Sequence, residues 1–241
     1  MTVDDYIVVD LEMTGLRAKT DRILEIGAVK VEHGHCTDVY HKLVNPHTEL
    51  PAEVVELTGI TQELAESGCE AEAAVAGFCG FAEGFPLVGH NILFDYRFLK
   101  QCSANHGIPF EKDGLDTLKL ARKFLPEAEK KTLDYLCAWL EIPRAQSHRA
   151  LEDARATAAL LQYLQQFETG DPEAFQPKPL LYKAKKQGPA SKRQKKRLKE
   201  LADWHKIELD VEIGSLTRNE ASRITDKILA RYGKIPKGEG Q

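Results

Sequence analysis

The change of hydrophobic period near residue 50 most constrains what this chain can fold into. Before that point, Tyr6–Asp10 is a short apolar run, Ile23–Glu32 alternates apolar and polar residues, and Cys36–Val44 alternates again. Such patterns predict three β-strands, and the short segments between them favour antiparallel pairing in a meander. After Pro51 the apolar residues recur mostly at helical spacing. A meander followed by alternating helices and strands predicts a mixed α/β layer fold.

The later elements follow from start and stop signals. Pro51 suits a first helical turn, and glycines or prolines close several of the helical patterns. The expected helices cover residues 52–57, 70–83, 93–105, 117–125, 132–140 and 149–167. Short strands are expected at residues 86–89 and around Leu115.

Composition indicates a globular protein with two unequal domains. The chain has 241 residues, of which 42% are apolar and 29% charged, values near the average for globular proteins. It has no stretch of about 18 uninterrupted apolar residues, and its start, MTVDDYIVVD, is acidic where a signal peptide would be basic. A cytoplasmic location is therefore expected. The five cysteines form no close pair, which argues against a disulfide framework or a zinc knuckle.

Charge divides the chain into an acidic part and a basic part. Residues 1–167 contain 16 Lys and Arg against 26 Asp and Glu, whereas residues 168–241 contain 17 against 11. Residues 168–190 carry four prolines and little periodicity, which predicts a linker. Residues 178–199 contain ten Lys and Arg and no acid. This run suits a phosphate backbone, although it could equally keep a linker in solution.

Residues 191–236 are expected to form a small helical module. Leu198, Leu201 and Trp204 lie at helical spacing in its first half. Thr217 and Glu220 fit a capping box that opens a second helix. Gly233 and Pro236 are expected to end that helix.

Three short segments contain acids or histidines that could act together. Asp10 and Glu12 end the first strand, where their spacing puts both carboxylates on one face and makes a site for hard divalent metals plausible. Asp95 lies in HNILFD, where a strand passes into a helix, and His148 and Asp153 lie in HRALED at the start of a long helix. Each segment alone has an ordinary structural explanation, such as a charged strand end or an acid that favours a helix start.

Together the three segments resemble the DEDDh 3′–5′ exonuclease family, whose pattern is Asp-x-Glu, a later Asp in an HNxxFD-like segment, and His-x-x-x-x-Asp. The resemblance covers roughly residues 4–167 and is greatest to the proofreading (epsilon) subunit of bacterial DNA polymerase III, which LTGIT at residues 57–61 and LDTL at residues 115–118 support. The opening DLEMTGL, with RILEI after it, is instead similar to oligoribonucleases, which act on short RNA.

The resemblance implies an RNase H-like fold and a mechanism with two divalent ions, Mg²⁺ or Mn²⁺. It implies that Asp10 bridges both ions, that Glu12 and Asp153 complete one site, and that Asp95 holds the other. His148 would be the general base, since its ordinary pKa lies near neutral pH. The implied reaction is hydrolysis of terminal phosphodiester bonds at single-stranded DNA 3′ ends in proofreading or repair, with release of nucleoside 5′-monophosphates.

The same resemblance suggests residues that contact the substrate. It would place Met13, Thr14, Gly15 and Leu16 under the terminal nucleotide. Met13 and Leu16 could alternatively be ordinary core residues. His90 and Asn91 could shape the substrate channel or brace the turn before Asp95.

Two other functions and several roles for the C-terminal module stay open. The chain could be an exoribonuclease or oligoribonuclease, or a nucleic-acid-binding scaffold without activity, although all four acids and the histidine are present. LTRNEAS at residues 216–222 resembles a segment of phage and bacterial DNA-metabolism proteins. The module could bind nucleic acid, dock a polymerase or repair partner, or cap the main domain. No membrane partner is expected.

Overall fold

The computed structural model describes residues 4–209 and 211–235 and divides into two compact units. The first unit comprises residues up to 46 together with residues 50–184, and the second comprises residues 47–49 and the chain from residue 185. Pro236, the expected stop of the last helix, lies outside the described residues.

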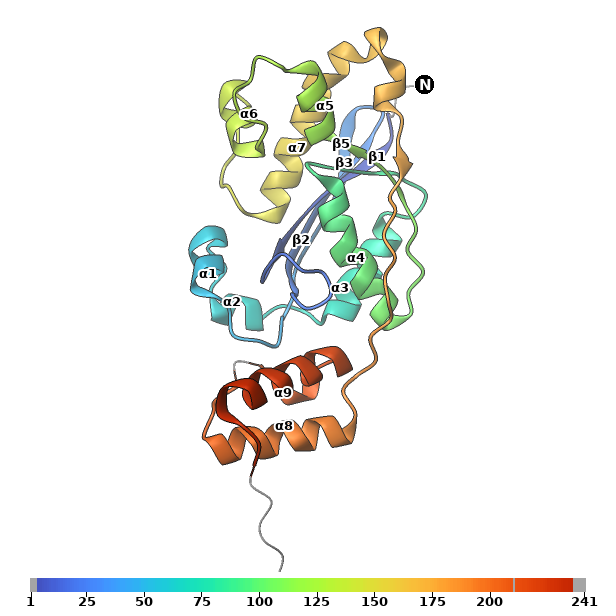
Figure 1. Ribbon diagram of the computed structural model, residues 1–241. Helices are drawn as coiled ribbons and strands as arrows, with labels where there is room; N and C mark the ends of the chain where they lie inside the picture. The colour runs from blue at the N-terminus through green and yellow to red at the C-terminus, as the bar shows by residue number, and fades with distance from the viewer. Residues whose placement is uncertain (1–3, 210, 236–241) are drawn as a thin grey trace, which may run out of the picture. The chain divides into compact units, whose positions relative to one another are not determined.

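The first unit is built on a mixed six-stranded sheet with strand order β3-β2-β1-β4-β5-β6 (Figure 1). β1, β2 and β3 form an antiparallel meander, β1, β4 and β5 run parallel, and β6 returns antiparallel to β5. The strands are β1 (Tyr6–Met13), β2 (Ile23–Glu32), β3 (His35–Leu43), β4 (Leu87–Gly89), β5 (Asp113–Asp116) and β6 (Lys178–Pro179). The predicted α/β fold, with a meander plus parallel strands, is confirmed.

The helices of the first unit alternate with the later strands. They are α1 (Ala52–Thr58), α2 (Gln62–Glu66), α3 (Ala71–Phe81), α4 (Ile92–His106), α5 (Thr117–Phe124), α6 (Leu133–Trp139) and α7 (Ala150–Leu164), followed by the 3-10 helices η1 (Gln165–Gly170) and η2 (Pro172–Phe175). The predicted helix boundaries agree with the observed ones to within a few residues. At α1 and α4 the reason is that Gly59 and Gly107 end the helices in left-handed conformations, which glycine adopts without strain.

Two hydrophobic cores cover the two faces of the sheet, and β1 contributes to both. Ile7, Val9 and Leu11 face the core that contains α3 and α4. Tyr6 and Val8 face the core that contains α5, α6 and α7. Because side chains alternate along a strand, Asp10 and Glu12 continue the face that Tyr6 and Val8 begin. The two acids therefore lie on the side of the sheet that α7 covers.

The structure differs from the predicted linker at residues 168–190. Residues 168–184 belong to the first unit, where Phe175 is 2% exposed and stacks on Phe124 with ring centroids 5.4 Å apart. The Leu180 amide donates to the Lys112 carbonyl at 2.9 Å, beside the pairing of β6 with β5. Isolated apolar anchors among prolines have no periodicity, so the pattern alone did not distinguish this segment from a linker.

The second unit contains α8 (Lys192–His205), η3 (Ile213–Ser215) and α9 (Arg218–Tyr232). Its own core contains buried residues from both helices and from the segments around them, namely Ala190, Leu198, Leu201, Leu216, Ala221 and Ile228. Both helices start with a capping box, formed by Ser191 with Gln194 and by Thr217 with Glu220. The predicted helical pair and the capping box at Thr217 are present.

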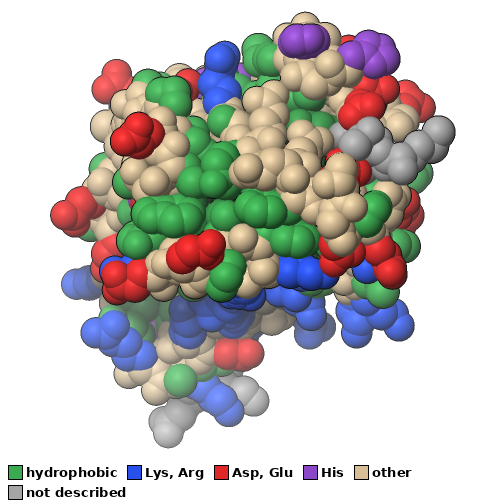
Figure 2. All heavy atoms as spheres, turned by 90° about the horizontal axis from the view of Figure 1, so that it is seen from above, with side chains coloured by type: hydrophobic (Ala, Val, Ile, Leu, Met, Phe, Trp, Pro, Cys, Tyr) green, Lys and Arg blue, Asp and Glu red, His purple; other side chains and the backbone are tan. Residues whose placement is uncertain are grey.

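Charge is distributed differently in the two units. Figure 2 shows acidic side chains around the margin of the first unit's visible face, with apolar and uncharged groups between them. In the second unit, residues 185–235 contain 14 Lys and Arg against seven Asp and Glu.

Among the described residues, no helix is both long enough and apolar enough to span a bilayer.

Candidate active site

Asp10 and Glu12 end the α7 side of β1 as the sequence pattern predicted. Glu12 is 8% exposed, and burial together with Asp153, Glu25 and Asp95 raises its pKa to about 8. Burial also raises the pKa of Asp10 well above its ordinary value, and Asp95, Asp153 and Glu12 add to that rise. Like charges held together in a poorly solvated place raise one another's pKa. The pair is therefore part of a larger acidic cluster.

Asp95 reaches this cluster from the first turn of α4. It is 5% exposed, and burial raises its pKa to about 8, while backbone hydrogen bonds at Asp95 itself and at Leu11 lower it. Leu11 lies between Asp10 and Glu12 in the sequence, so its backbone hydrogen bond puts the Asp95 carboxyl beside the end of β1 that carries the two acids. Asp95 on α4 thus lies close to Asp10 and Glu12 on β1.

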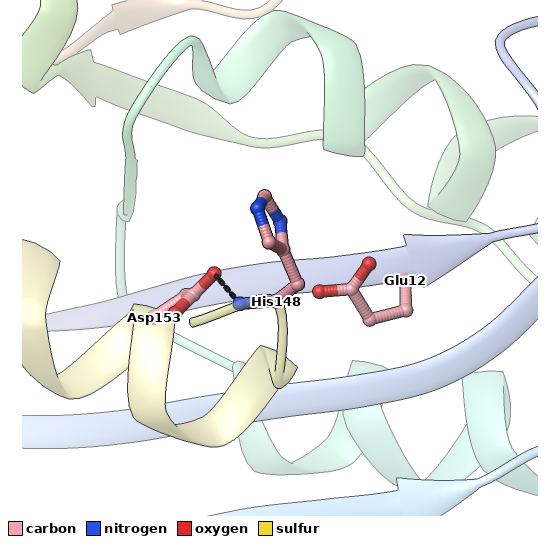
Figure 3. Close-up of side chains that lie close together, drawn as sticks. All are labelled: Glu12, His148 and Asp153. Atoms are coloured by element: carbon pink, nitrogen blue, oxygen red, sulfur yellow. Dashed lines mark hydrogen bonds between the residues drawn. The ribbon is translucent and has the colours of Figure 1, made fainter. Parts of the chain in front are cut away.

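His148 and Asp153 come from the start of α7 (Figure 3). His148 has a left-handed backbone with φ of 57°, and its amide donates to Asp153 Oδ2 at 3.2 Å. One ligand atom each from Glu12, His148 and Asp153 lie within 4.8 Å of one another. Burial raises the pKa of Asp153, although the neighbouring Arg144 lowers it. The structure thus brings all five predicted residues to one site.

Gly27 lets α7 approach the sheet closely enough to build this site. It pairs with Asp10 across the β1–β2 ladder. A Cβ at Gly27 would lie 2.1 Å from the amide nitrogen of Leu151 and 2.2 Å from the carbonyl carbon of Ala150. Any other side chain would push the start of α7 away from β2. Packing of helix backbone directly on strand backbone therefore sets the depth of His148 and Asp153.

Glu25 also holds the start of α7 in place, a role that the sequence analysis did not predict. It lies opposite Glu12 in the ladder and is fully buried. It accepts from the Ala150 amide at 3.0 Å and pairs with Arg149 Nη2 at 2.7 Å and with His41 Nε2 at 2.6 Å. Although burial raises its pKa, these hydrogen bonds hold the pKa of Glu25 below its ordinary value. The sequence signal that contains Glu25 is RILEI at residues 22–26, and a resemblance at these residues assigns Glu25 no role.

Arg144 is a second residue that the sequence patterns did not single out. Its guanidinium pairs with Asp153 and with Asp134, and Nε donates to Asp153 Oδ1 at 2.7 Å. His148 Nε2 lies 3.7 Å from Asp134 Oδ2. Arg144 therefore supplies positive charge beside the acids and connects the α6 helix, through Asp134, to the start of α7. It lies in a loop without periodicity, where no motif marks it.

His90 and Asn91 brace the turn between β4 and α4. His90 Nδ1 lies 3.0 Å from Thr117 Oγ1 and Nε2 lies 2.7 Å from the Lys131 carbonyl, and burial lowers its pKa. The Asn91 amide donates to Asp116 Oδ1 at 3.0 Å, and its φ of 73° is left-handed. Of the two roles open from sequence, these contacts match the bracing role.

The segment Met13–Leu16 divides into packed and exposed residues. Met13 packs against the core that contains α3 and α4, and Thr14 Oγ1 accepts from the Arg22 amide at 2.9 Å. Gly15 passes so close to Asp21 that a Cβ there would lie 2.5 Å from its Oδ2. Leu16 is 79% exposed. The core alternative thus holds in part for Met13, whereas Leu16 is available to a ligand.

The donor set fits hard divalent cations. Four carboxyl groups with raised pKa values, all from Asp and Glu, repel one another, and a bound cation would relieve that repulsion. Oxygen donors of this kind suit Mg²⁺ and Mn²⁺. The arrangement can therefore hold metal next to a histidine able to accept a proton.

Proteins similar to this chain include exonucleases and DNA polymerases. A family model described as "RNase_T: Exonuclease" matches residues 7–161. The DNA polymerase III PolC-type of Thermotoga petrophila is 41% identical over 154 residues, which are 64% of this chain and 11% of that protein. The chain thus spans about a tenth of the length of the curated relatives it matches.

Two solved structures show the same fold. Exonuclease X, in complex with 5′-overhanging duplex DNA, is 25% identical with a TM-score of 0.56 and covers 68% of this chain and 93% of that chain. Exonuclease I of E. coli, in a zinc-bound complex with single-stranded DNA, is 18% identical with a TM-score of 0.63 and covers 71% of this chain and 42% of that chain.

Proposed function

This chain belongs to the exonuclease family, and on that premise we propose that it is a metal-dependent 3′–5′ exonuclease that shortens single-stranded DNA from its 3′ end and releases nucleoside 5′-monophosphates. The family predicted from the three sequence motifs is confirmed. The observation that carries the proposal is the convergence of Asp10, Glu12, Asp95 and Asp153 with His148.

In the proposed reaction, a water molecule attacks the terminal phosphodiester. Two Mg²⁺ or Mn²⁺ ions would supply a more acidic water and stabilise negative charge on the leaving oxygen. Asp10 would hold both ions, Glu12 and Asp153 one of them, and Asp95 the other. His148 accepts the proton of the attacking water on a ring nitrogen. The new bond joins the water oxygen to phosphorus, the bond from phosphorus to the 3′ oxygen breaks, and that oxygen leaves on the shortened strand.

The positioning contacts support this division of roles. Glu25 and Gly27 set the start of α7, and thereby the place of His148 and Asp153. Arg144 balances charge at Asp153. In the proposed complex Leu16, exposed beside Thr14 and Gly15, packs on the terminal nucleotide, while Met13 supports that segment from the core.

DNA is the proposed substrate because of the relatives. One is a DNA polymerase III and one solved neighbour at 25% identity holds duplex DNA with a 5′ overhang. A role in proofreading or repair, with a polymerase or repair protein as partner, is the corresponding proposal. The opening DLEMTGL favours short RNA as the second candidate substrate, through its similarity to oligoribonucleases. A cytoplasmic location remains a prediction from sequence.

The test uses a 5′-labelled single-stranded DNA with Mg²⁺ or Mn²⁺. The wild-type protein is expected to shorten it stepwise, and Asp10→Asn is expected to reduce the rate by at least about 1000-fold, since loss of a metal ligand removes several kcal/mol of transition-state stabilisation. Asp38→Asn, at an exposed acid on β3, is the matched control and should keep the wild-type rate. Undiminished cleavage by Asp10→Asn would remove the site assignment.

The same assay on a matched RNA oligomer separates the two substrate classes. A preference for RNA of tenfold or more would replace DNA as the proposed substrate. Absence of cleavage of both oligomers, with binding retained, would favour the scaffold function instead.

A further inference from the structure

The exposed side of α8 is strongly basic. Residues 192–199 contain six Lys and Arg and no acid. Five of these six side chains are exposed, namely Lys192, Arg193, Lys196, Arg197 and Lys199. The sixth, Lys195, donates from Nζ to the Gly214 carbonyl at 2.8 Å and so serves the module's own structure. Leu198 and Leu201 face the core, so the charged side faces solvent, where Lys196 Nζ lies 3.8 Å from Glu200 Oε1 in an exposed pair that contributes little to stability.

Folding does not account for this charge. The N-terminal end of a helix carries partial positive charge, so cations there oppose the helix dipole. α8 has basic residues in its first turns and places Glu200 and Asp203 near its C-terminal end, which is the reverse of the favourable order. Like charges at Lys192 and Lys196, one turn apart, also repel. A local rule broken in this way points to a ligand that the charges serve.

Trp204 adds an aromatic surface beside the charges. Its side chain is 57% exposed although tryptophan is usually well covered. Arg193, Arg197 and Trp204 are separated by four and seven residues, a spacing that puts them along one side of the helix. Over this length the helix rises about 16 Å, enough to follow several phosphates. Cations along a row that ends in an exposed aromatic ring are typical of surfaces that bind single-stranded nucleic acid.

We propose that the α8 face, defined here as Arg193, Lys196, Arg197 and Trp204, binds single-stranded DNA, with the cations on phosphates and the indole ring on a base. This is a second DNA contact, separate from the acidic site. Single strands suit it because their base faces are accessible to the ring, whereas bases in a duplex are stacked. The inference rests on the proposed function for the choice of DNA as the polyanion.

The test measures binding of the full chain to fluorescein-labelled dT20 by anisotropy, in EDTA so that no cleavage occurs. The test variant carries Arg193→Gln, Lys196→Gln and Arg197→Gln. The matched control carries Lys227→Gln, Arg231→Gln and Lys234→Gln, which removes the same charge from exposed positions in and after α9. We expect the test variant to bind about tenfold more weakly at moderate salt and to lower the slope of log affinity against log salt by about two, with the control within twofold of wild type.

Trp204→Ala should weaken binding about fivefold or more without changing the salt slope, since stacking releases no counterions. Equal losses in the two triple variants would overturn the proposal, because only net charge would then matter. Competition by poly-glutamate as strong as that by unlabelled dT20 would overturn it in favour of an acidic protein partner. A lower melting temperature in the test variant would indicate a structural role, whereas we expect it unchanged or higher.

A separate measurement distinguishes failure of the proposed function from failure of the α8 proposal. Wild-type hydrolysis of the p-nitrophenyl ester of thymidine 5′-monophosphate reports the acidic site without a long DNA strand. If the wild-type protein lacks that activity but the binding results are as expected, the exonuclease proposal fails and the α8 face stands.

Discussion

The acidic site and the α8 face are both clusters of like charge, but they differ in burial. Glu12, Asp95 and Asp153 are 5–8% exposed, and their pKa values are raised. The cations of the α8 face are exposed to water, which screens their repulsion. Arg144 offsets part of the repulsion in the buried cluster, and a bound ion or a proton relieves the rest, whereas α8 tolerates its charges with little cost. Changes at the first cluster should therefore have the larger effects.

After the loss of a metal ligand, the largest effect is expected from Gly27→Ala, which changes no charge. The new Cβ would meet the backbone of Ala150 and Leu151 at 2.1–2.5 Å, so α7 must move. We expect cleavage to fall about 100-fold, because small misplacements of catalytic groups have effects of that size. Overpacking should also lower the free energy of unfolding by about 3 kcal/mol. Cleavage rate and chemical unfolding measure the two effects.

Gly80→Ala is the control for Gly27→Ala. Gly80 lies within α3, and a Cβ there meets no atom within 4 Å. Alanine should raise stability by up to about 1 kcal/mol, since it favours a helix over glycine. Equal activity in the two variants would show that the depth of α7 does not set the geometry of the acidic site.

The next effect concerns pH in the absence of metal. Glu12 and Asp95 have folded pKa values of about 8, above the ordinary values of roughly 4 that they regain on unfolding. The folded state thus binds more protons, so its stability is greatest below about pH 4 for these groups and falls as pH rises through 8. Between pH 5 and pH 9 in EDTA, we expect a loss of about 3 kcal/mol, or several degrees in melting temperature.

Metal and mutation should both flatten this pH dependence. Saturating Mn²⁺ or Mg²⁺ binds the ionised carboxylates and stabilises the folded state most at high pH. Glu12→Gln removes one of the titrating groups and should raise the metal-free stability at pH 9. Melting curves of wild type and variant at both pH values, with and without Mn²⁺, measure this. A metal-free melting temperature that rises from pH 5 to pH 9 would contradict the cluster's assigned repulsion, provided the Asp38→Asn control behaves as wild type.

A smaller effect is expected from removing residues 178–184, which join the first unit to the second. A chain ending at Ala184 keeps the whole first unit, whereas a chain ending at Pro177 loses β6 and residues 178–184. Leu180 and Tyr182, which pack on the sheet's core, go with them. We expect the shorter chain to lose about 2 kcal/mol relative to the longer one by chemical unfolding. Equal stability would return residues 178–184 to the linker predicted from sequence.

The sequence predicted those parts of the molecule in which a local pattern carries the physical cause. β2 was predicted with its observed bounds because its alternation reflects burial. Asp10, Glu12, Asp95, His148 and Asp153 were predicted to lie together because their order matches a family pattern, and the structure brings them close to one another. Glu25 was missed because its fully buried charge depends on Arg149 and Ala150, about 125 residues away along the chain. Such long-range pairs leave no periodicity to read.

The smallest effect is expected from Lys192→Glu at the start of α8. It replaces a cation beside the positive end of the helix dipole with an anion, so helix stability should rise by about 0.5 kcal/mol. The same change puts negative charge next to the α8 face and should weaken dT20 binding about threefold or more. Glu200→Gln, on the same helix, removes the ion-pair partner of Lys196, 3.8 Å away, and should strengthen binding with little change in stability. If Lys192→Glu weakened both stability and binding, its charge would serve the fold of the module; opposite signs in the two measurements are what a surface kept for a polyanion requires.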